Sequence, residues 1–287
     1  MDEIYTNRKL SQRYPDLDKL EFDKFTSLLA QRSAEEEKAR IERLFKYLNR
    51  LVDLSEGRNV LVVGCGPKPL TIKTLVENSY NVVGIEPTLS FVHSAREYLG
   101  SESLILEGSA ENLPVPDHSQ HLVLLETVME HVDSPINSLT EIFRVLAPGG
   151  ICYISTVNRY RISLSGENGE FNVKYYNWFP EILKKCFVFN HLHYEPHLSN
   201  YAQRPAVHWY TYAELCKLGR YVGFSHFYSL IDLLNLNDES ISKSKVRRFI
   251  LNKLKYNPWL RALALTQAGD SIIMFKRTEE TYQNQTT

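Results

Sequence analysis

Five short runs of apolar and β-branched residues, separated by segments of helical pattern, constrain the fold of this chain most strongly. Strands that alternate with helical crossovers are typical of a parallel, doubly wound sheet. Another helix and two strands are expected at 211–222, 225–230 and 271–276. The sequence therefore predicts an α/β fold with a Rossmann-like sheet, mostly parallel with an antiparallel last strand. The five runs are NVLVV (59–63), NVVGI (81–85), SLILE (103–107), HLVLLE (121–126) and ICYIST (151–156), and the crossovers span 69–79, 88–99 and 135–146, the last closed by Pro148-Gly149-Gly150.

A chain of 287 residues is long enough for one α/β domain that carries insertions. Residues 16–54 are charged and helix-favouring, so we expect an N-terminal helical segment over 1–55. The domain itself is predicted over 56–277, and the polar residues 278–287 are expected to be a disordered tail. Two insertions interrupt the domain, at 160–210 and at 240–266. The first is rich in aromatic residues, with 12 of the chain's 33 in 51 positions.

Composition limits the classes of partner and the compartment. The formal net charge is -1, so the molecule has no overall basic field of the kind that binds nucleic acid, and none is expected as a partner. Four widely spaced cysteines form neither a CxxC pair nor a zinc ligand set, which favours a reduced, cytosolic protein. No apolar run reaches the roughly 18 residues needed to span a bilayer. We expect a cytoplasmic protein without a signal peptide or membrane span; the oligomeric state is not predicted.

A glycine turn and an acidic residue mark the ends of the first two predicted strands. Gly64-Cys65-Gly66 directly follows the first strand and allows close approach of backbone to a ligand. This pattern also fits a nucleotide-dependent oxidoreductase, but a dinucleotide site expects a third glycine where Pro69 stands. Glu86, at the end of the second strand, can accept hydrogen bonds from the two hydroxyls of an adenosine ribose. The alternative for Glu86 is a solvated charge at a strand end.

Taken together, the motifs of residues 59–158 resemble class I S-adenosylmethionine-dependent methyltransferases. They are VVGCG, VVGIEP, EGSAENLPVPDHSQHLVLLETVMEHVDSP and RVLAPGGICYISTVNR. The ExxxEHV pattern at 126–132 and STVNR at 155–159 are similar to ubiquinone-biosynthesis O-methyltransferases. The resemblance implies that S-adenosyl-L-methionine is the cofactor. It implies that the methionine part is wrapped by Gly64, Cys65 and Gly66, the ribose is held at Glu86-Pro87, the adenine is edged by Ser109, Ala110 and Glu111, and Glu126 lies near the aminoacyl end or the substrate.

Methyl transfer requires alignment of an acceptor with the methyl group and exclusion of water. The aromatic insertion 160–210 is the candidate cap over such a site, or else a structural subdomain. A hydroxyl acceptor needs a general base, for which His131 and His208 are the candidates, each with a structural role as the alternative. No metal site is predicted. The group His191, His193, Glu195 and His197 has only one HxH pair, and Glu126 with Glu130 favours an ordinary solvated pair over a divalent-ion site.

The second insertion is basic and contains no acidic residue. Seven lysine and arginine residues alternate with apolar ones over 240–266, which predicts a basic amphipathic helix. One interpretation of this helix is peripheral contact with an anionic membrane. The alternative is a lid or dimerisation helix that packs its apolar face on the domain. The resulting hypothesis is a methyltransferase that acts on a small-molecule acceptor, such as a hydroxyl of a lipid, quinone or sugar-like metabolite. The alternatives are the oxidoreductase and a non-catalytic S-adenosylmethionine-fold binding protein, the latter because Val62, Lys68 and Ser109 depart from the family pattern.

Overall fold

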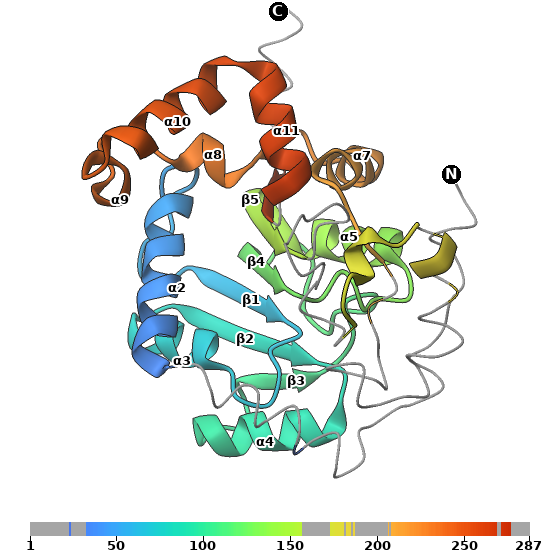
Figure 1. The fold of residues 1–287 in the computed structure, drawn as a ribbon. Coiled ribbons are helices and arrows are strands. Elements are labelled where there is room, and N and C mark those ends of the chain that lie inside the picture. Colours follow the sequence, from blue (N-terminus) through green and yellow to red (C-terminus); the bar gives the residue numbers. More distant parts are fainter. Residues whose placement is uncertain are drawn as a thin grey trace, which may run out of the picture.

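Seven strands form one mixed sheet across the part of the chain that the computed structural model describes, residues 23, 33–156, 173–180, 182–184, 186, 206, 208–268 and 271–276 (Figure 1). The strand order is β3-β2-β1-β4-β5-β7-β6, in which β7 runs antiparallel to both of its neighbours and the other pairs are parallel. The predicted fold class is therefore confirmed. The strands are β1 Asn59–Val63, β2 Asn81–Glu86, β3 Ile105–Glu107, β4 Gln120–Glu126, β5 Leu146–Ser155, β6 His226–Tyr228 and β7 Ser271–Phe275.

The helices begin and end where local chemistry favours it. The side chains of Ser33, Ser134 and Thr211 cap the N-termini of three of them by accepting backbone N–H bonds, and Gly100 in the left-handed conformation ends a fourth. No described helix is both long and apolar enough to cross a bilayer. The helices are α2 Ala34–Leu48, α3 Leu70–Glu77, α4 Leu89–Leu99, α5 Pro135–Val145, α7 Tyr212–Val222, α8 Leu230–Leu233, α9 Glu239–Ser242, α10 Lys245–Tyr256 and α11 Pro258–Ala268, with a 3-10 turn at Tyr176–Trp178.

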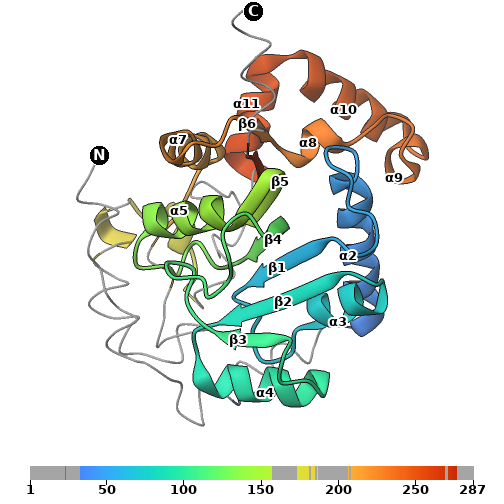
Figure 2. The same ribbon diagram turned by 180° about the vertical axis from the view of Figure 1, so that it is seen from behind.

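Helices cover both faces of the sheet, as the views from opposite sides show (Figures 1 and 2). Alternate residues of β1 point to opposite faces. Leu61 and Val63 join a core with residues of α5 and α7, whereas Val60 and Val62 join a second core with residues of α2, α3 and α4. Because both faces are buried, the central strands are continuously apolar rather than alternating.

Three predicted boundaries differ from the structure. The helix expected up to residue 54 ends at Leu48, and the turn that follows is held by Asn49, whose side chain accepts the backbone N–H of Leu54. Pro148-Gly149-Gly150 lies inside β5, where a register shift against β4 accommodates it. The single helix predicted over 240–266 is three helices, because Ser244 caps α10 and Asn257-Pro258 begins α11. The expectations for residues 1–22, 24–32 and 277–287 lie outside the described residues.

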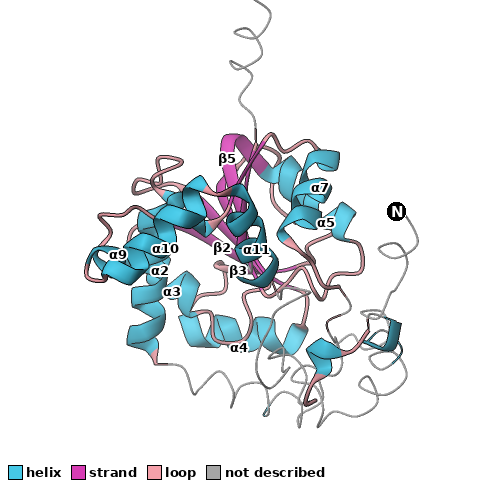
Figure 3. Cartoon of the chain, turned by 45° about the horizontal axis from the view of Figure 1, so that its top comes forward, coloured by secondary structure: helices cyan, strands magenta, loops and turns pink. Residues whose placement is uncertain are grey.

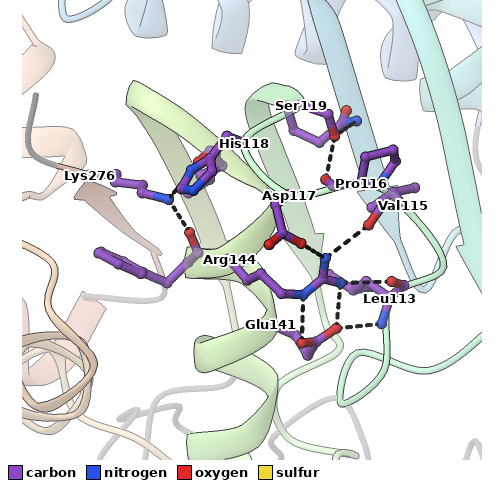
Figure 4. Close-up of polar contacts among 12 residues, drawn as sticks. Leu113, Val115, Pro116, Asp117, His118, Ser119, Glu141, Arg144 and Lys276 are labelled. Carbon is purple, nitrogen blue, oxygen red and sulfur yellow. Dashed lines mark hydrogen bonds and ion pairs between the residues drawn. The ribbon is translucent and has the colours of Figure 1, made fainter.

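A polar network ties the loop between β3 and β4 to the end of α5 (Figure 4). Arg144, in the last turn of α5, donates to the carbonyls of Leu113 and Val115 at 2.9 and 3.0 Å and pairs with Asp117 at 2.5 Å and Glu141 at 2.7 Å. The ammonium of the buried Lys276 donates to backbone carbonyls at the end of the same helix, 2.5 Å to Phe143 and 2.7 Å to Leu146. This loop begins at the residues predicted to edge the adenine, so the network fixes one side of that site.

Candidate cofactor site

The predicted cofactor residues come together at the C-terminal ends of β1, β2, β3 and β4. The chain reverses its direction of strand addition between β3 and β4, which makes the β1–β4 boundary the topological switch point where open α/β sheets bind ligands. The residues at this edge are Gly64, Cys65 and Gly66 after β1, Glu86 and Pro87 at the end of β2, Ser109, Ala110 and Glu111 after β3, and Glu126 at the end of β4.

The glycine turn after β1 is fixed on one side and open on the other. The backbone N–H groups of Gly64 and Cys65 both donate to the carbonyl of Ile85, at 2.8 and 3.2 Å. Gly64 and Gly66 have φ values of 67° and 68°, a left-handed conformation that side chains disfavour. A Cβ on Gly64 would lie 2.4 Å from Val128 Cγ2, whereas a Cβ on Gly66 would meet nothing within 4 Å. The space beside Gly66 is therefore where a ligand can approach the backbone.

Glu86 is a buried carboxylate that holds this turn to the next helix. Its side chain is 4% exposed, Oε2 accepts the backbone N–H of Gly66 and Oε1 accepts that of Thr88, each at 3.0 Å. The alternative of a solvated charge at a strand end is thus wrong. A carboxylate can accept more than two hydrogen bonds, and the binding of ribose hydroxyls by Glu86 while it holds the loop stays a prediction.

Cys65 lies between the two glycines but has the properties of a packing residue rather than a nucleophile. Burial raises the pKa of its thiol, and the nearby negative charge of Glu86 raises it further. The sulfur would lie 3.1 Å from a Cβ placed on Gly84, so it fills the space next to that residue of β2. Cys65 stays a neutral thiol at physiological pH.

The segment expected to edge the adenine is tied to the loop after β4. Ala110 is buried, and the backbone N–H of Asn112 donates to the carbonyl of Ser109 at 3.1 Å. Glu111 Oε1 accepts the backbone N–H of Asp133 at 2.8 Å, directly before α5. These contacts explain why the segment keeps its shape, and its contact with adenine stays a prediction.

Glu126 is paired with an arginine that the sequence reasoning missed. Arg40 of α2 donates to both oxygens of Glu126, at 2.6 and 2.9 Å, and also to both oxygens of Glu37, at 2.9 and 2.6 Å. Burial alone lowers the pKa of the Arg40 guanidinium, but hydrogen bonds and charges from Glu37 and Glu126 raise it above its ordinary value. The guanidinium therefore stays protonated between two carboxylates, and the net charge of this cluster at the β4 edge is negative. From the sequence, Glu37 and Arg40 are three positions apart, which predicts their local helical ion pair but not the contact of Arg40 with Glu126.

Both histidines proposed as bases meet the loop that follows β4. His131 is half-buried in that loop, and its backbone N–H donates to the carbonyl of Val128, the residue packed against Gly64. His208 is buried, and its Nε2 lies 2.9 Å from the carbonyl of Val132, so Nε2 carries the proton in this geometry. Both residues thus lie at this loop, and their role as bases stays a prediction.

Glu130, in the same loop, is fully buried and is not half of a solvated acidic pair. Its Oε2 accepts the hydroxyl of Thr156 at 2.6 Å, which links this loop to the end of β5. Within the described residues, no three side chains of the metal-binding types gather into a cluster, and His191, His193, Glu195 and His197 lie outside that part of the chain.

The described part of the aromatic insertion forms a small packed cluster. Tyr176 is fully buried, with its ring centroid 6.0 Å from that of Phe179 and 6.3 Å from that of Trp209. Tyr175 and Trp178 are more than half exposed. The packing supports a structural role for Tyr176, and a cap formed by the exposed rings stays a prediction.

A doubly wound α/β domain with a candidate ligand site at the switch point of its sheet is the class that this geometry defines. Residues 61–154 match the family model described as "Methyltransferase domain". The chain carries a class I S-adenosylmethionine-dependent methyltransferase domain, and the cofactor of that domain is S-adenosyl-L-methionine, as the resemblance implied.

Relatives match a limited part of the chain. An uncharacterized methyltransferase of Schizosaccharomyces pombe is 33% identical over 104 residues, covering 32% of this chain and 37% of its own length. A "probable S-adenosylmethionine-dependent methyltransferase" of Mycolicibacterium smegmatis is 32% identical, covering 40% of this chain and 44% of its own length. The mitochondrial ubiquinone biosynthesis O-methyltransferase of Dictyostelium discoideum is 31% identical over 38% of each chain. The chain therefore spans less than half the length of these relatives.

The fold has a counterpart among solved structures. A Galdieria sulphuraria protein provisionally assigned as a sarcosine dimethylglycine methyltransferase superposes with a TM-score of 0.51 at 14% identity, covering 83% of this chain and 86% of its own. At that identity the likeness concerns the fold alone.

Proposed function

We propose that this chain transfers a methyl group from S-adenosyl-L-methionine to a small-molecule acceptor. The observation that carries the proposal is Glu86, whose buried carboxylate is joined to the open glycine turn at Gly66 at the switch point of the sheet. A carboxylate beside an approachable backbone suits a ribose followed by an extended chain. The residues present fit the cofactor, and Gly64, Cys65, Gly66 and Glu86 would hold it.

When bound, the cofactor supplies an electrophilic methyl group on a positively charged sulfur. The residues of this chain orient the two partners for an in-line displacement, in which the bond to sulfur breaks as the bond to the acceptor forms. Such alignment is worth several kcal/mol of activation energy, up to about 11 kcal/mol in well-oriented cases. The fixed glycine turn and the buried loop after β4 are suited to hold that alignment.

The Arg40–Glu126 pair lies at the edge of this site, and together with Glu37 it leaves a net negative charge there. Arg40 already donates four of its five N–H groups to Glu37 and Glu126, so this cluster suits an ammonium group rather than a second carboxylate. We propose that the pair binds the aminoacyl end of the cofactor or a charged group of the acceptor.

A hydroxyl acceptor loses its proton during the transfer, so a base must take it up. We propose His131 or His208 for this step, because both lie at the loop after β4 and imidazole titrates near neutral pH. The acceptor is proposed to be a lipid, quinone or sugar-like hydroxyl compound. The first two would lie in a membrane, and the proposal therefore includes peripheral membrane contact through residues 240–266.

The proposal is tested by cofactor binding and by transfer. S-adenosylhomocysteine is expected to raise the melting temperature of the protein, and NAD is not. Incubation with methyl-labelled S-adenosylmethionine and a fractionated cell extract, followed by mass spectrometry, is expected to label a small molecule. Stabilisation by NAD alone would favour the oxidoreductase, and binding of S-adenosylhomocysteine without transfer to any fraction would favour the non-catalytic binding protein.

A further inference from the structure

Helix α10 turns its apolar residues away from the domain. Leu251 is its buried residue, at 3% exposure, and it packs toward the molecule. Val246, Phe249 and Ile250 are 66%, 63% and 49% exposed. Their spacing of three and four places them on one face of the helix, nearly opposite Leu251. The outward face of α10 therefore carries three large apolar side chains among its exposed basic ones, unlike the polar outer face of an ordinary surface helix.

Helix α11, which follows α10 directly, shows the same arrangement. Leu265 is buried at 8% exposure, whereas Trp259 and Leu263, four residues apart, are 85% and 60% exposed. Tyr256, at the end of α10, is 79% exposed. Isolated apolar residues on a surface are ordinary, but seven large ones on two consecutive helices, Leu260 at 41% exposure included, are of the kind that marks an interaction site.

The two helices are fixed to the domain through other residues. Arg261 of α11 donates to both oxygens of Asp232 in α8, each at 2.6 Å. Arg50, after α2, pairs with Asp238 at 2.5 Å and also donates to the carbonyl of Leu233. The buried and ion-paired residues thus hold the segment from α8 to α11 in place. The alternative in which the apolar face of the basic segment packs on its own domain is contradicted by the exposure of that face.

The location of these side chains suits contact with an extended surface. Helices α9, α10 and α11 lie together at one end of the molecule in both opposite views (Figures 1 and 2). With that end turned forward, α10 and α11 lie in front of the strands (Figure 3). A flat partner can therefore reach both helices.

The charge of the segment identifies the partner. Residues 240–266 contain seven lysines and arginines and no acidic residue. Lys245 and Lys253 are exposed on the same side of α10 as Phe249, and the Lys253 ammonium lies 5.5 Å from the centroid of the Phe249 ring. Exposed aromatic rings beside basic side chains are typical of helices that lie in the interface of an anionic membrane. A second copy of this chain would bring like charges together, which disfavours it as the occupant.

We infer that the outward faces of α10 and α11 dock on an anionic lipid bilayer, with Phe249 and Trp259 inserted among the headgroups and Lys245 and Lys253 at the lipid phosphates. The docking would bring the protein to a lipid-borne acceptor, and only this use of the surface rests on the proposed function. Each basic side chain near such a surface strengthens binding roughly fivefold.

Sedimentation of the full chain with vesicles tests the inference. Vesicles of phosphatidylcholine alone are compared with vesicles that contain about one third phosphatidylglycerol. The wild type is expected to bind the anionic vesicles at least tenfold more tightly than the neutral ones. The variants Phe249→Ser with Trp259→Ser, and Lys245→Glu with Lys253→Glu, should each weaken that binding at least roughly tenfold.

Matched controls stand on α7, at the exposed Tyr221 and Lys217. Tyr221→Ser and Lys217→Glu are expected to bind anionic vesicles as the wild type does. Equal, negligible binding to both vesicle types would overturn the inference, as would tight binding that survives the Phe249 and Trp259 changes. Self-association in analytical ultracentrifugation that those two changes abolish would also overturn it, in favour of a second copy. Stabilisation by S-adenosylhomocysteine, measured on the same samples, separates failure of the surface from failure of the cofactor site.

Discussion

Replacement of Glu86 by glutamine perturbs the centre of the site with little change in size. Both carboxylate oxygens accept backbone N–H groups at 3.0 Å in a side chain that is 4% exposed. Glutamine keeps one acceptor oxygen, so its NH2 group must face the N–H of either Gly66 or Thr88. The change therefore removes the charge and sets one donor against another.

The magnitudes for the fold and for the ligand follow from these contacts. A hydrogen bond to a charged group contributes about 1.5–3 kcal/mol, so the loss of one of the two loop contacts should lower the free energy of unfolding by roughly 2–3 kcal/mol. Two ribose hydroxyls that lose a charged acceptor should cost roughly 2–4 kcal/mol of binding. That range corresponds to S-adenosylhomocysteine binding weakened between about 30-fold and about 1,000-fold.

The assay is isothermal titration calorimetry with S-adenosylhomocysteine, together with urea unfolding of each variant. Glu97→Gln, at an exposed position of α4, is the matched control and should match the wild type in both measurements. If a folded Glu86→Gln protein binds S-adenosylhomocysteine within about twofold of the wild type, the assignment of Glu86 to the ribose is refuted.

Three further predictions concern the turn, the edge of the site and the polar network. Gly66→Ala has room for its Cβ, so it should lower the free energy of unfolding by only about 1–2 kcal/mol while it blocks cofactor binding. In Gly64→Ala the new Cβ would lie 2.4 Å from a side chain, so this variant should lose more stability in urea unfolding. Equal stabilities of the two variants would contradict this. Arg40→Met should weaken S-adenosylhomocysteine binding or acceptor use at least roughly fivefold in calorimetry and turnover, while Arg43→Met, exposed on the same helix, changes neither. Hydrogen bonding to Arg144 lowers the pKa of Glu141. The ionised Glu141 therefore stabilises the fold above the unfolded pKa of about 4.3, and this contribution is lost as pH falls through the lower folded pKa. Glu141→Gln should therefore be destabilised by roughly 1 kcal/mol at neutral pH, a difference that shrinks toward pH 3 in urea unfolding, and a pH-independent difference would refute the reasoning.

Local sequence patterns were enough to predict the sheet and to place the candidate cofactor residues at one edge of it. Short β-branched runs and helical periods are local properties, so the strands that begin at Asn59 and Asn81 could be located without a structure. Parallel strands end at one edge, and residues at those ends, such as Gly64 and Glu86, must gather there whatever the loops do. These predictions needed only neighbouring residues and the rules of sheet connection.

Contacts between side chains that are far apart in the sequence could be seen only in the folded chain. Arg40 meets Glu126 from 86 positions away, and His208 meets the carbonyl of Val132 from 76 positions away. Such pairs depend on how α2 and the segment after the aromatic insertion pack, which no local pattern specifies. The basic segment is the clearest case, since helical spacing showed that Phe249 and Ile250 share a face but not whether that face is covered. Burial of Leu251 and Leu265 against the domain is the packing result that turns the other side outward.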